Sequence, residues 1–68
     1  MNEILRRIRS LGWMVGAHND YRINGKYMTY WMFTHSEGIY VKGEAETDES
    51  ALTECLEKVL GLRLSHER

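Results

Sequence analysis

Residues 21–35 decide the fold, and their sequence is YRINGKYMTYWMFTH. The pair Asn24-Gly25 stands between two runs rich in aromatic and β-branched side chains. Both residues tolerate the positive φ that the central positions of a type I′ turn require, and this turn matches the twist of a hairpin. The stretch therefore predicts a β-hairpin whose first strand ends near Ile23 and whose second strand covers residues 26–35.

The chain beyond the hairpin predicts a third strand and a helix. A short loop at residues 36–38 precedes Ile39-Tyr40-Val41-Lys42, which completes a three-stranded antiparallel meander. Thr47 is the expected N-cap of the helix, because Asp48 and Glu49 follow it in the first turn, where negative charge is favourable. Apolar residues then repeat at helical spacing until Gly61. They are Ala51, Leu52, Cys55, Leu56, Val59 and Leu60.

The chain before the hairpin predicts a first helix over residues 2–11. Asn2 is its expected N-cap, and Gly12 is expected to end it. The apolar stripes of the two helices should pack on one side of the sheet. Their inward residues would be Leu5, Ile8, Leu52, Leu56 and Val59. The sequence thus predicts a two-layer α+β domain of order α-β-β-β-α over residues 1–64, with a frayed tail at residues 65–68.

The length and composition of the chain restrict the class of protein to which it can belong. The chain has 68 residues and 8.0 kDa, which leaves room for one domain, and its 43% hydrophobic content excludes a disordered segment. It has no apolar stretch of membrane-spanning length and one cysteine, so we expect a cytoplasmic protein without disulfides. The net charge of −1 divides into +3 over residues 1–42 and −4 over residues 43–68. This balance does not favour a polyanion as partner.

The predicted second strand carries large side chains on both faces. Because side chains alternate across a strand, Trp31 and Phe33 share one face while Met28, Tyr30 and Met32 share the other. Two short helices can cover only one face of the sheet. We expect them to cover the face with the bulkier side chains, Trp31 and Phe33. The expected outer-face residues are Met28, Tyr30, Met32 and Tyr40. Three interpretations remain open for this face: it is partly solvated and has no partner, it is buried against a second copy or a protein partner, or it stacks on nucleic-acid bases.

Gly43-Glu44-Ala45 leaves the last strand, and Thr47 then opens a helix with Ala51 on its inner face. Together with the element order, this resembles the double-stranded-RNA-binding domain over most of the chain. In that family a lysine cluster at the start of the second helix grips phosphates across a groove. Here the corresponding positions hold Asp48-Glu49-Ser50. The resemblance therefore implies the fold and not the binding of duplex RNA.

Residues 18–21 and 30–35, followed by Val41-Lys42-Gly43-Glu44, are similar in style to small uncharacterised phage and prophage proteins. This resemblance covers the central part of the chain. It implies an accessory or host-interaction role, and no reaction.

The residue types that carry chemistry are scattered along the chain. His18, His35, His66 and Cys55 include preferred metal ligands, but no pair has the short spacing of a structural zinc site. No Ser, Thr or Cys has a general base at a spacing typical of nucleophilic catalysis, and the sequence contains no glycine-rich phosphate-binding loop. We therefore expect no enzyme, no metal and no cofactor, but a small interaction module that binds itself or another protein. The alternative is weak nucleic-acid binding by a basic set with the strand aromatics. That set comprises Arg6, Arg7, Arg9, Arg22 and Lys26.

Overall fold

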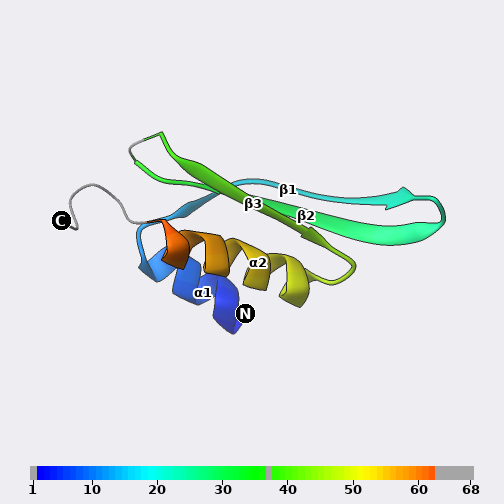
Figure 1. Cartoon of the computed structure of the whole chain (residues 1–68), viewed down its shortest axis with the longest axis horizontal. Helices are drawn as coiled ribbons and strands as arrows, with labels where there is room; N and C mark the ends of the chain where they lie inside the picture. The colour runs from blue at the N-terminus through cyan, green and yellow to red at the C-terminus, as the bar shows by residue number, and fades with distance from the viewer. Residues whose placement is uncertain (1, 37, 63–68) are drawn as a thin grey trace.

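The computed structural model describes residues 2–36 and 38–62, and it shows two helices on one face of a three-stranded sheet (Figure 1). The elements are α1 (Glu3–Ser10), β1 (Met14–Ile23), β2 (Lys26–Thr34), β3 (Tyr40–Ala45) and α2 (Asp48–Gly61). The sheet is antiparallel with strand order β1-β2-β3. The predicted α-β-β-β-α architecture is therefore confirmed. The predicted tail, and residues 63–64 of the predicted domain, lie outside the described residues.

The local signals act as the sequence predicts. The Asn2 side chain accepts hydrogen bonds from the backbone N–H groups of Ile4 and Leu5 at 2.7 and 3.2 Å. Thr47 accepts one from Ser50 at 3.2 Å. The hairpin turn places Asn24 at φ 52° and Gly25 at φ 78°. The largest error concerns β3, which was expected to end at residue 42. It continues to Ala45, because Glu44 and Ala45 still pair with β2.

The core lies between the sheet and α2, with α1 packed beside α2 (Figure 1). Phe33 of β2 is fully buried, whereas Trp31 is partly buried at the border of the core. The buried apolar residues are Ile8, Trp13, Phe33, Val41, Ala51, Leu52, Cys55 and Val59. Of the expected inward residues, Leu5 and Leu56 only flank this core. Trp31 and Phe33 thus belong to the helix-covered face, as expected.

Gly43 permits the close contact between β3 and α2. A Cβ atom at this position would lie 2.4 Å from the carbonyl oxygen of Ala51 and 2.9 Å from the Cys55 sulfur. A side chain there would push the helix off the sheet. The absence of a side chain at Gly43 therefore lets α2 settle directly on the strand.

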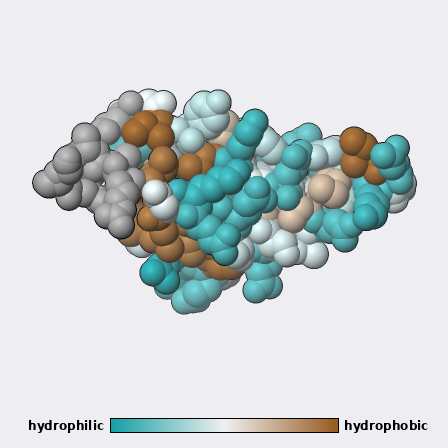
Figure 2. All heavy atoms as spheres, viewed as in Figure 1, coloured by the Kyte–Doolittle hydropathy of each residue, from teal (hydrophilic) through white to brown (hydrophobic). Residues whose placement is uncertain are grey.

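The β1–β2 hairpin extends past the helices. The molecule measures 45 × 22 × 17 Å, and its long axis ends at the hairpin turn (Figure 1 and, with all heavy atoms drawn, Figure 2). We call residues 21–28 the hairpin arm. Lys26 on this arm pairs with Glu46, in the connection between β3 and α2, at 3.2 Å. Within the described part of the chain, neither helix has the length and apolar content needed to cross a bilayer.

Candidate functional site

The first candidate surface is the outer face of the sheet, opposite the helices. Met28, Tyr30 and Met32 lie there as the sequence predicts, but they are partly buried. Tyr40 of β3 is 59% exposed. The face is thus less open over β2 than expected, and its most accessible aromatic side chain lies on β3.

A polar contact across the middle strand explains part of this burial. The Tyr21 hydroxyl of β1 donates a hydrogen bond to Glu44 of β3. Since β2 lies between these strands, with Met28 opposite Tyr21 and Tyr30 opposite Glu44, the contact crosses β2 between those two side chains. The bond to the carboxylate raises the pKa of Tyr21. This bridge closes the arm-side half of the face and leaves the other half accessible.

The accessible half includes Met14, which the sequence analysis missed. Met14 lies opposite Thr34, and Thr34 lies opposite Tyr40, so these three residues form one row across the sheet. Met14 is 68% exposed. A β-bulge between Val15 and Ala17 gives Met14 this orientation, because simple alternation from the turn would put it on the helix side. The outer-face patch consists of Met14, Met28, Tyr30, Met32 and Tyr40.

The basic residues do not form one surface. The arginines Arg6, Arg7 and Arg9 belong to α1, whereas Arg22 and Lys26 lie beside the hairpin turn at the far end of the molecule (Figure 1). Lys26 is moreover paired with Glu46. The hairpin arm therefore separates Arg22 and Lys26 from the arginines of α1, and the five cations of the predicted basic set do not lie together.

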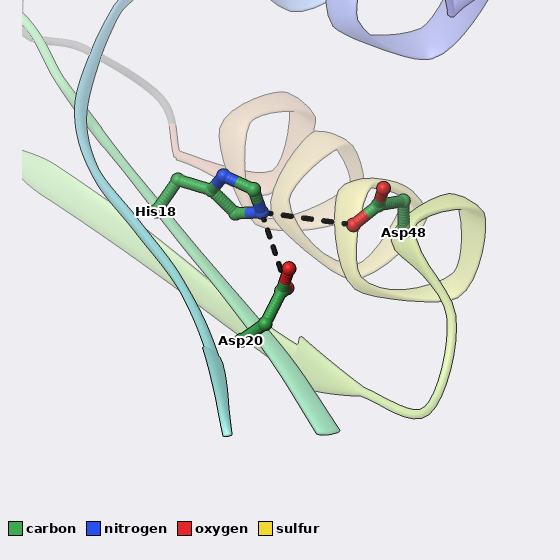
Figure 3. Close-up of side chains that lie close together, drawn as sticks. All are labelled: His18, Asp20 and Asp48. Carbon is green, nitrogen blue, oxygen red and sulfur yellow. Dashed lines mark ion pairs between the residues drawn. The ribbon is translucent and has the colours of Figure 1, made fainter. Parts of the chain in front are cut away.

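The second candidate site is a cluster of His18, Asp20 and Asp48 (Figure 3). His18 and Asp20 lie two residues apart on β1, so strand alternation puts both on the helix side. Asp48 begins α2. The Nε2 atom of His18 is 3.4 Å from a carboxylate oxygen of Asp20 and 3.8 Å from one of Asp48. The spacing of His18 and Asp20 was visible in the sequence, but the approach of Asp48 was not.

Neighbouring side chains hold the cluster in place. The Asp48 oxygen accepts hydrogen bonds from Thr29 Oγ1 at 2.9 Å and from Trp31 Nε1 at 3.0 Å. The Trp31 and His18 rings stack with centroids 3.9 Å apart. Thr29, which donates to Asp48, is itself only 2% exposed. A hydrogen bond from the Tyr27 hydroxyl to Asp20 raises the pKa of Tyr27. The three groups of the cluster are therefore oriented by rings and hydroxyls of the sheet.

The cluster lacks the geometry of a hydrolytic triad. Thr29 Oγ1 lies 3.4 Å from His18 Nε2, the same ring nitrogen that both carboxylates approach. A triad needs the nucleophile on one imidazole nitrogen and the carboxylate on the other. Thr29 also donates its proton to Asp48 rather than to the histidine. The arrangement can bind a cation, but it does not activate the Thr29 hydroxyl.

The other candidate ligands lie elsewhere. Cys55 is buried in α2, and burial raises the pKa of its thiol to about 11. His35 packs against Trp13 with ring centroids 5.0 Å apart. His66 lies outside the described residues. No protein-family model, curated protein or solved structure matches the chain.

Asp48 makes stability depend on pH. The hydrogen bonds from Trp31 and Thr29, and then the charge of His18, lower its pKa below the usual 3.8. A depressed carboxyl pKa stabilises the fold above the unfolded-state value, and this contribution is lost as the pH falls through the folded-state value. We expect Asp48→Asn to lower the melting temperature at pH 7, with the gap to the parent shrinking below about pH 4. Thermal melts of both proteins from pH 7 to pH 2.5 measure this, and a gap independent of pH would contradict it.

Proposed function

We propose that this protein is a non-enzymatic interaction module that binds a second copy of itself through the outer-face patch. The observation that carries the proposal is the row formed by Met14, Thr34 and Tyr40. It crosses all three strands on a face that no element of the described chain covers, and its two large side chains remain 68% and 59% exposed. Uncovered apolar surface of this kind marks interaction sites, and Met and Tyr are enriched in them.

Charges beside the patch support a second copy as the occupant. Lys42 and Glu44 lie on β3, on the same face as Met32 and Tyr30, which they pair with. Lys42 forms no ion pair within residues 2–36 and 38–62. In a two-fold dimer with antiparallel β3 strands and its axis beside Gly43, each Lys42 would lie opposite Glu44 of the other copy. A symmetric interface needs this self-complementarity, because the same surface serves both subunits.

The chemistry of the described side chains supports binding rather than catalysis. The Cys55 thiol is buried with a pKa of about 11, so it is protonated and unreactive at neutral pH. The Thr29 hydroxyl donates its hydrogen bond to Asp48 rather than to His18. A buried thiol that forms no disulfide also supports a reducing compartment such as the cytosol.

Nucleic-acid binding has weaker support. The arginines of α1 and the cations of the hairpin lie at opposite ends of the molecule, so they cannot line one groove (Figure 1). The first turn of α2 presents Asp48 and Glu49, which repel phosphate. We therefore place the aromatic residues of the sheet in a protein interface rather than under stacked bases.

Charged substitutions in the row test the proposal. We expect the parent to show a mass near twice 8.0 kDa by light scattering. Tyr40→Lys and Met14→Lys should each weaken dimerisation at least about 30-fold, because a buried interface anchor contributes about 2 kcal/mol or more. Both side chains are exposed in the single chain, so the melting curve of the isolated monomer should change little. Sedimentation equilibrium measures the dissociation constants.

Leu60→Lys is the matched control. Leu60 is exposed to a similar degree, at 55%, but it lies on α2 in the helix layer. The control should dimerise like the parent. A parent that stays monomeric at every accessible concentration contradicts the proposal. So does a dimer that survives both row variants, particularly if Leu60→Lys dissociates it.

A further inference from the structure

We infer that His18, Asp20 and Asp48 form a binding site for a divalent transition-metal ion of the zinc type. One imidazole and two carboxylates converge there, and their ligand atoms all lie within 4.8 Å of one another (Figure 3). This inference concerns the helix side of the sheet. It is independent of the proposed dimer on the outer face.

The distances in the cluster favour a metal site over a tight ion pair. His18 Nε2 lies 3.4 and 3.8 Å from the two carboxylate oxygens. Both separations exceed the roughly 2.7–3.2 Å of a nitrogen–oxygen hydrogen bond. Ligand atoms about 2.0–2.2 Å from a tetrahedral zinc ion lie about 3.3–3.6 Å apart. The His18–Asp20 separation falls in this range and the His18–Asp48 separation lies slightly beyond it, so a small shift of the side chains would place all three groups around one ion.

The surroundings resemble the outer shell of a metal site. Metal-binding carboxylates and imidazoles are held by further contacts that fix their orientation. Asp48 accepts hydrogen bonds from Thr29 and Trp31, and His18 stacks on the Trp31 ring. Little rearrangement is then needed when an ion binds.

The ligand set indicates the class of ion. Imidazole nitrogen with carboxylate oxygen suits zinc and its neighbours in the first transition row, whereas calcium and magnesium prefer oxygen ligands alone. Three protein ligands leave at least one coordination position for water. The cluster is exposed, with side-chain exposures of 37% for His18 and 59% for Asp48. A bound ion would therefore link β1 to the first turn of α2 without being enclosed.

Titration with Zn²⁺ alone tests the inference. In calorimetry the parent should bind one ion per chain, and in NMR spectra the ring signals of His18 and the indole signal of Trp31 should shift. Zn²⁺ should also raise the melting temperature, since an ion that binds only the folded state stabilises it. His18→Ala and Asp48→Asn should each lower the affinity at least about tenfold.

Two control variants separate this site from other sources of binding. Glu49→Gln removes the neighbouring carboxylate in the first turn of α2, and His66→Ala removes a histidine outside the described residues. Both should bind Zn²⁺ like the parent. Circular dichroism shows whether each variant is folded. If Asp48→Asn is unfolded, the NMR shifts of His18 and Trp31 in the parent decide the question. Failure of the parent to bind at millimolar Zn²⁺, or binding that His66→Ala abolishes and His18→Ala does not, overturns the inference.

Discussion

Gly43→Ala is expected to remove a large part of the stability of the fold. The new Cβ would lie 2.4 Å from the Ala51 carbonyl oxygen, a distance that real Cβ atoms do not show. Because this neighbour is backbone in the first turn of α2, the start of the helix must move away from β3. Overpacking, including the backbone shifts that it forces, costs about 1–3 kcal/mol and occasionally more. A single core of this size supplies only about 3–5 kcal/mol. Urea unfolding followed by circular dichroism measures the loss.

Gly61→Ala is the matched control for this substitution. Gly61 ends α2, and a Cβ atom there meets nothing within 4 Å. Since alanine favours helix over glycine, we expect this variant to be as stable as the parent or more stable by up to about 1 kcal/mol. Equal unfolding midpoints for Gly43→Ala and the parent would show that α2 does not rest on β3 as the structure describes.

Leu52→Ala should also lower the free energy of unfolding strongly. Leu52 is 1% exposed between α2 and the sheet, so truncation leaves a cavity as well as losing buried area. We expect a cost of about 2–5 kcal/mol, a large part of the total stability. The sequence pattern gives Leu56 the same role, but the structure leaves Leu56 partly exposed at the edge of the core. Leu56→Ala should therefore cost clearly less.

Unfolding of the two leucine variants in urea compares the two positions directly. An order in which Leu56→Ala is the more destabilised would contradict the packing of α2. Equal and small effects would show that the helix contributes little to the core.

Local chemistry determined much of this fold. The Asn24-Gly25 pair, the caps at Asn2 and Thr47 and the two apolar stripes each act through neighbouring residues, so the sequence predicts them directly. Alternation along β2 likewise separates Phe33 from Met32. For these features, the interactions that decide the structure lie within a few positions of one another along the chain.

The sites depend on contacts that span the chain. Met14 joins the outer-face patch because the β-bulge before Ala17 inverts the alternation of β1, and a bulge is a property of strand pairing. The basic residues separate because the hairpin extends beyond the helices. Asp48 reaches His18 across thirty positions because the side chain missing at Gly43 lets α2 lie directly on the sheet. The elements and their buried faces thus follow from local patterns in the sequence. Only tertiary packing decided which side chains meet, because those distances depend on how the strands and helices are placed against one another.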